Sequence, residues 1–140
     1  MTAIRERTAM IAGMRPQLVP GAFHFCTLSD PVQISQAMPD AVGSFHEAEG
    51  LSVILPEATA QLLGLATGNP MRQITLQVFS GLDGVGLTAA VAGILADHGI
   101  ACNMVAAFHH DHAFVPGADA QRALDLLVAL ATGTTAKAQA

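Results

Sequence analysis

Four polar residues that could ligate a metal ion or transfer a proton follow one another near the end of the chain. They are His109, His110, Asp111 and His112, in the stretch FHHDHAF. A zinc site needs three or four such ligands that converge on one point. On a strand, His110 and His112 share one face and His109 and Asp111 the other, so only a turn could bring His110, Asp111 and His112 together. Metal binding by these three residues is one hypothesis; a hairpin tip, in which aspartate favours the tight turn, is the other.

No pattern typical of covalent catalysis accompanies the histidines. A catalytic nucleophile needs a positioned base, and the chain has no G-x-S-x-G stretch. Cys26 and Cys102 lie far apart in apolar, strand-like runs. We therefore expect both thiols to be free and buried, and we expect the protein not to be an enzyme.

Composition narrows the class of protein further. The chain has 140 residues, of which 51% are hydrophobic, and a formal net charge of -5. Its six Lys and Arg residues are scattered, which argues against nucleic-acid binding. The longest charge-free apolar stretch, between Asp83 and Asp97, is too short to span a bilayer. No signal peptide is recognisable, so we expect a cytoplasmic protein that binds no membrane and no cofactor.

The second half of the chain shows the clearest secondary-structure pattern. Alternating apolar residues in ITLQVF predict a half-buried strand over residues 74–79. The glycine-rich turn SGLDGVG follows, and apolar residues at helical spacing then predict a helix over residues 87–98, ended by Gly99.

A hairpin and a second helix should complete this half. Residues 100–108 and 112–116 have strand character, and the three residues between them leave room only for a tight turn. We expect Phe108 and Phe114 to anchor the hairpin in the core. The stretch ADAQRALDLLVALA then predicts a helix with one apolar face.

The first half carries a partial repeat of the second. SVILPEATAQLL matches HAFVPGADAQRA at a constant offset of sixty residues, with Pro56 and Pro116 where a strand leads into a helix. Residues 21–30 should form an earlier strand. The segment after it is weakly patterned, and we expect at most a short helix near residues 40–47. The first half is therefore predicted to be an abbreviated version of the second.

The longest stretches of the chain resemble a known family. LVPGAFHFCTLSD, FHEAEGLSVILPEATAQLLGL, AQRALDLLVAL and the block from Ile74 to Pro116 resemble small bacterial proteins built of two ACT-like halves. The resemblance implies an α+β fold of two ferredoxin-like βαββαβ half-domains, each an antiparallel sheet with helices on one face. Residues 1–69 would form the abbreviated half, 70–133 the second half and 134–140 a flexible tail. The second half lacks an evident closing strand, for which the stretch TAMIAGM is a candidate.

The resemblance also implies a ligand site. ACT modules commonly bind small ligands, usually amino acids, where the first strand turns into the first helix, facing the second strand of a neighbouring module. Glycines there allow close approach of the backbone, a helix N-terminus favours a carboxylate, and Asp83 could meet an ammonium group. Asp83 could instead cap the helix, and Asn103 could secure a sheet edge. The implied ligand-binding residues are Ser80, Leu82, Asp83, Gly84, Val85, Gly86, Leu87, Thr88, Cys102, Asn103 and Met104.

Three functions remain open from the sequence. The leading hypothesis is a regulatory or sensor protein, without catalytic activity, that binds a small molecule such as an amino acid and forms a homodimer. The second is a module that dimerises or docks on an enzyme without any ligand. The third is a metal-binding protein that uses the cluster from His109 to His112.

Overall fold

The computed structural model describes residues 3–133, and they divide into two compact units. One unit contains the segments up to Val19 and from Arg72 onward, and the other contains Pro20–Met71. The expected boundary near residue 70 lies close to the second of these junctions. The expected 134–140 tail lies outside the described residues. No helix in residues 3–133 is long and apolar enough to cross a bilayer.

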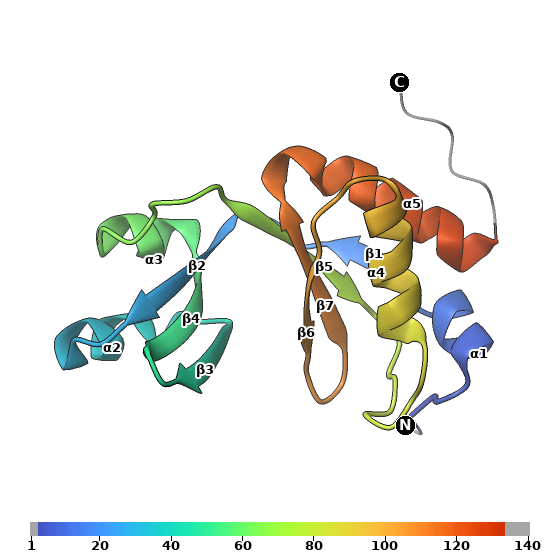
Figure 1. The fold of residues 1–140 in the computed structure, drawn as a ribbon, viewed down its shortest axis with the longest axis horizontal. Coiled ribbons are helices and arrows are strands. Elements are labelled where there is room, and N and C mark those ends of the chain that lie inside the picture. Colours follow the sequence, from blue (N-terminus) through green and yellow to red (C-terminus); the bar gives the residue numbers. More distant parts are fainter. Residues whose placement is uncertain (1–2, 134–140) are drawn as a thin grey trace. The chain divides into compact units, whose positions relative to one another are not determined.

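The unit that contains the glycine turn, which we call unit 1, is built on a sheet in the order β1-β5-β7-β6. The strands are β1 (Pro16–Leu18), β5 (Met71–Leu76), β6 (Asn103–Ala106) and β7 (Asp111–Pro116). Its helices are α1 (Arg7–Ala12), α4 (Leu87–Asp97) and α5 (Ala120–Thr132), with a short 3-10 turn, η1 (Gly117–Asp119), before α5. Figure 1 shows α4 and α5 beside each other, with α1 close to both.

The core of unit 1 lies between one face of the sheet and these three helices. Ile74 and Leu76 of β5 and Ala113 and Val115 of β7 are fully buried in it. They meet apolar residues of the helices, namely Met10, Leu87, Val91, Leu95, Ala123, Leu126 and Leu127. The helical spacing of residues 87–98 is confirmed by α4, after which Gly99 takes the left-handed conformation, with φ of 71°.

The closing strand of unit 1 comes from the N-terminal segment, as expected, but from different residues. TAMIAGM, residues 8–14, does not form it, because most of this stretch lies in helix α1, where Met10 is buried. Instead β1 pairs antiparallel with β5, joining Pro16 to Leu76 and Leu18 to Ile74. The helix ends at Ala12, and the three-residue strand begins only at Pro16.

The other unit, unit 2, contains β2 (Phe23–Leu28), α2 (Pro31–Ala37), β3 (Gly43–Glu47), β4 (Gly50–Pro56) and α3 (Glu57–Leu62). Its strands lie in the order β3-β4-β2, and both pairings are antiparallel. A separate small core contains Leu28, Ala37, Val53, Leu55 and Ala60. Both units thus follow the order β-α-β-β-α, and the α+β fold of two ferredoxin-like halves is confirmed.

Two local expectations were wrong. Residues 40–47 do not form a helix: the helix of this segment is α2, capped by the Asp30 side chain, and residues 43–47 form β3 because they pair with β4. Phe108 does not anchor the hairpin in the core, since it is 67% exposed, whereas Phe114 is buried. The internal repeat is visible in the structure. Pro56 and Pro116 each end a strand and precede a helical turn, and the two prolines have nearly the same φ and ψ angles.

Candidate functional site

The glycine turn between β5 and α4 is held by the N-terminal segment. The backbone N–H of Ile4 donates to the carbonyl of Phe79 at 2.8 Å, and the N–H of Gly81 donates to the carbonyl of Ile4 at 2.9 Å. The Nε of Arg5 lies 2.6 Å from Oδ1 of Asp83. The turn is therefore fixed by residues that lie almost eighty positions earlier in the sequence.

The glycines of this turn are needed for close packing. A Cβ at Gly84 would lie 3.0 Å from the sulfur of Met10, and one at Gly86 would lie 2.6 Å from Cδ of Arg7. Gly86 also has a φ of +110°, which disfavours any L side chain. These glycines were expected to allow close approach of a ligand, whereas their close neighbours in the structure include Met10 and Arg7.

A small cavity of about 120 Å³ nevertheless remains beside the turn. Its volume corresponds to about four water molecules at about 30 Å³ each. The turn and the start of α4 supply most of its lining, and α1 and the β6–β7 hairpin supply the rest: Met10, Ser80, Gly81, Leu82, Gly84, Gly86, Leu87, Thr88, Ala106 and Asp111. Six of the eleven residues expected to bind a ligand thus lie around one cavity, and Met10, Gly81, Ala106 and Asp111 are additions.

Asp111 supplies the one acidic side chain of this cavity. It is the first residue of β7, opposite Ala106 of β6, and shares a strand face with Ala113 and Val115, which lie in the core. Only 8% of its surface is exposed. Burial raises the pKa of its carboxyl, while the neighbouring His112 and His110 act in the opposite direction. Within residues 3–133, no hydrogen bond or ion pair joins its carboxylate to another residue.

The N-terminus of α4 supplies the opposite polarity. Leu87 and Thr88, its first two residues, line the cavity. The N-cap residue is Gly86, and no side chain caps the helix. The first backbone N–H groups of a helix have no partner within the helix and carry partial positive charge, so they suit a carboxylate.

Two residues of the turn do not take the expected place. Asp83 neither lines the cavity nor caps α4, because its carboxylate pairs with Arg5, and the hydrogen bond from Arg5 lowers the pKa of Asp83. Val85 points to solvent and is 79% exposed. The partner of Asp83 could not be inferred from the sequence, because Arg5 is 78 positions away.

The histidines do not converge with Asp111. On the opposite face of the sheet, Nδ1 of His112 lies 3.0 Å from Oγ1 of Thr75 and 3.2 Å from Nε2 of Gln73. Burial, and secondarily the neighbouring His110, lowers the pKa of His112, which therefore favours its neutral form. No group of three or more His, Cys, Asp or Glu side chains in the described part of the chain is placed to hold a metal ion. This geometry does not support a metal site formed by His110, Asp111 and His112.

The other two histidine contacts belong to the hairpin tip. Nδ1 of His110 lies 3.3 Å from the carbonyl of Val78. The ring of His109 packs edge-on against Phe108, with centroids 4.9 Å apart, and against Phe79 at 5.3 Å. The N–H of Ala107 donates to the carbonyl of His110 and closes the turn. These contacts fit the interpretation of the stretch as a hairpin tip.

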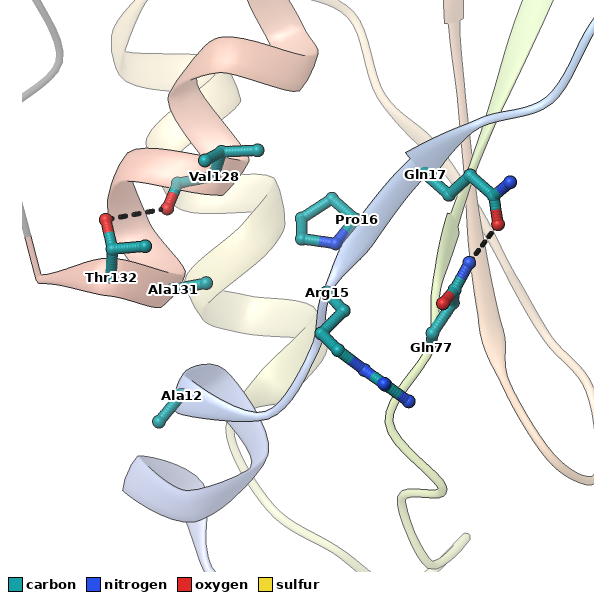
Figure 2. Close-up of a pocket in the computed structure, with 8 residues that line it drawn as sticks. All are labelled: Ala12, Arg15, Pro16, Gln17, Gln77, Val128, Ala131 and Thr132. Carbon is teal, nitrogen blue, oxygen red and sulfur yellow. Dashed lines mark hydrogen bonds between the residues drawn. The ribbon is translucent and has the colours of Figure 1, made fainter.

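A larger groove lies elsewhere in unit 1. It measures about 510 Å³ and runs between α1, β1 and the end of α5, lined by Ala12, Arg15, Pro16, Gln17, Gln77, Val128, Ala131 and Thr132. Figure 2 shows that its polar groups already pair with one another, Gln77 with Gln17 and Thr132 with the carbonyl of Val128. Arg15 is its one charged side chain and is exposed. The groove contains no buried charged group comparable to Asp111.

Comparison with known families decides the classification. Residues 2–72 match one profile of the ACT domain, and residues 70–129 match a second. The chain belongs to the ACT-domain family. A comparison with functionally curated proteins gave no significant match.

Solved structures agree with the ACT fold. A Vibrio cholerae protein of unknown function, described as a possible transport protein, is 38% identical with a TM-score of 0.77, over 89% of this chain and 94% of that one. An Agrobacterium tumefaciens protein is 19% identical with a TM-score of 0.62, over 83% and 87% of the two chains. Escherichia coli aspartokinase III, solved with aspartate and ADP, is 12% identical with a TM-score of 0.55, over 82% of this chain and 32% of its own. The last two show the fold alone.

The ACT resemblance also pointed to Cys102, Asn103 and Met104, and these do not line the cavity. Cys102 and Met104 are half-buried against the core of unit 1, while Asn103 is exposed on β6 and pairs through its backbone with Phe114. Burial raises the pKa of the Cys102 thiol and also that of Cys26. In this unit the ACT glycine turn is therefore joined by the last residue of the second strand, Ala106, and the first residue of the third strand, Asp111, rather than by Cys102, Asn103 and Met104.

Proposed function

We propose that this chain is a regulatory ACT-domain protein that binds a small amino acid at the glycine-turn cavity and catalyses no reaction. ACT domains have a regulatory, ligand-binding role in general. The observation that carries the proposal is the cavity itself, which gathers six of the expected residues at the uncapped N-terminus of α4. The carboxylate of the amino acid would accept hydrogen bonds from the first N–H groups of that helix.

A thermal-shift panel tests this proposal. Glycine, alanine and serine fit a cavity of this size, whereas leucine and phenylalanine serve as large counterparts. A ligand that binds only the folded protein, at one hundred times its dissociation constant, stabilises it by about 2.7 kcal/mol. We therefore expect a rise in Tm with at least one small amino acid at millimolar concentration.

Two variants, in which one of two neighbouring alanines is replaced by leucine, locate the site. Ala106→Leu places a larger side chain at the cavity and should abolish the ligand-induced rise in Tm. Ala107→Leu, next to it, does not line the cavity and should retain the rise. The proposal fails if no amino acid raises the Tm of the wild-type protein, or if both variants respond as the wild type does.

A ligand-free interaction module is the second candidate, and exposed apolar side chains in unit 2 favour it. Phe45 of β3 is 72% exposed, and Val42 before it is also exposed. Phe45 lies opposite Ser52 on the sheet face turned away from the small core. We propose that the protein is a homodimer, and this face is one candidate for the contact. Sedimentation of the wild type and of Phe45→Ser tests the idea, which fails if both sediment as monomers.

A further inference from the structure

We propose that Asp111 is the residue that binds the ammonium group of the ligand, so that this cavity selects amino acids over the corresponding hydroxy acids. The inference rests on the proposed function and deepens it, since it names the group that defines the ligand class. Asp83, the acidic residue expected from the sequence, is excluded from this role because it pairs with Arg5 outside the cavity.

Burial without a partner is the first argument. Only 8% of the Asp111 residue is exposed, and a carboxylate in such a largely buried residue is costly unless it is paired. Asp111 has no hydrogen bond or ion pair with any other residue in 3–133. Asp111 is one of the residues that line the glycine-turn cavity. A cation placed there would supply the missing partner.

The chemistry of the lining is the second argument. Besides Asp111, the polar side chains around the cavity are the hydroxyls of Ser80 and Thr88. An ammonium group donates three hydrogen bonds, and a carboxylate and two hydroxyls can accept them. Structural metal sites are usually held by three or more His, Cys, Asp or Glu side chains, and the described residues form no such group here.

The third argument is that the positive helix N-terminus and the negative Asp111 border the same cavity. The uncapped start of α4 and the first residue of β7 both border this small cavity. An α-amino acid carries its carboxylate and its ammonium on the same carbon, so its two charges can meet both ends at once. A plain carboxylic acid would leave Asp111 unpaired and would add a second negative charge beside it.

The test uses matched pairs of small ligands on the full chain. Glycine, alanine and serine are titrated against glycolate, lactate and glycerate, in which a hydroxyl replaces the ammonium. Binding is followed by chemical-shift changes of the backbone amides of Gly86–Thr88. The wild type should favour each amino acid that it binds over its hydroxy acid by a factor on the order of ten or more.

Asp111→Asn is the decisive variant, because asparagine keeps the shape and removes the charge. It should lose the preference while its spectrum stays that of a folded protein. Asp97→Asn, which removes an acidic side chain at the exposed end of α4 and away from the cavity, should keep it. The inference is overturned if wild-type protein binds lactate as tightly as alanine, or if Asp111→Asn retains the full preference. If no ligand binds the wild type, the proposed function is overturned as well. If ligands bind without preference for the ammonium group, only the role of Asp111 is overturned. If Asp111→Asn does not fold, the lactate-to-alanine comparison on the wild type still decides.

Discussion

Replacing Asp111 by asparagine should stabilise the ligand-free protein. The wild-type carboxylate is buried and has no partner among residues 3–133, so its charge is a cost in the folded state at neutral pH. Leaving a buried polar group unsatisfied costs about 1–3 kcal/mol, and more when the group is charged. Asparagine still buries a polar amide, so we expect a net gain of about 1 kcal/mol in the free energy of unfolding. In a small domain this corresponds to roughly 4–8 °C in Tm.

The gain should depend on pH in a defined direction. Burial raises the pKa of Asp111 in the folded state above its unfolded value of about 3.9. The ionised carboxylate therefore destabilises the wild type above the folded pKa, and this penalty disappears as the pH falls through that value. The advantage of the asparagine variant should be largest near pH 7 and shrink toward pH 4. The positive charges of protonated His110 and His112 favour the ionised form of the Asp111 carboxyl, so the change in stability with pH will be broader than for an isolated carboxyl.

Urea unfolding of both proteins between pH 4 and pH 7.5 measures the effect. Asp97→Asn, at an exposed position near the end of α4, is the matched control for loss of one negative charge. Its stability should change little across this range. The reasoning is refuted if Asp111→Asn is less stable than wild type at pH 7, or if the difference between the two is the same at every pH.

Two further predictions concern the backbone and the thiols. Gly86→Ala should destabilise the protein by about 1–2 kcal/mol in urea unfolding, because Gly86 has a φ of +110° and a Cβ there would meet Arg7. The control is Gly93→Ala, on the exposed face of α4 with nothing near its Cβ, which should be neutral or stabilising by up to about 1 kcal/mol. Equal effects at both positions would contradict the assignment of strain to Gly86. Burial raises the pKa of the Cys26 and Cys102 thiols, so both should react with a disulfide reagent at pH 8 more slowly than glutathione does, and faster once urea is added; a folded-state rate equal to that of glutathione would argue against their burial.

Local pattern predicted the second half of the fold well because its signals agree with one another. The helical spacing of residues 87–98, the stop at Gly99 and the alternation around Ile74 each favour the element that forms. Residues 43–47 show the opposite case. Their local pattern is weak, and pairing with β4 determines their conformation. Only a tertiary partner supplies that information.

The candidate site was predicted in part for a similar reason. The glycine turn could be located from spacing and family resemblance, and strand parity placed Asp111 on the face opposite His110 and His112. That this face opens onto the turn depends on the β6–β7 hairpin lying against the start of α4, which no local pattern encodes. The choice between Asp83 and Asp111 likewise depended on Arg5, a residue distant in sequence whose pairing appears only in the folded chain.

The strand β1 gives the chain an architecture that differs from its linear repeat. The family profiles follow each other along the sequence, yet unit 1 is completed by residues that precede unit 2. Unit 2 is thus an inserted domain, and the residues of unit 1 that flank it are bonded to each other, since the N–H of Val19 donates to the carbonyl of Gln73 at 2.8 Å and Arg72 donates to the carbonyl of Val19. Cutting the chain at residue 70 would separate β1 from the sheet that it closes. Excising residues 20–70 and joining the two neighbouring ends by a short turn would leave β1 paired with a complete β5.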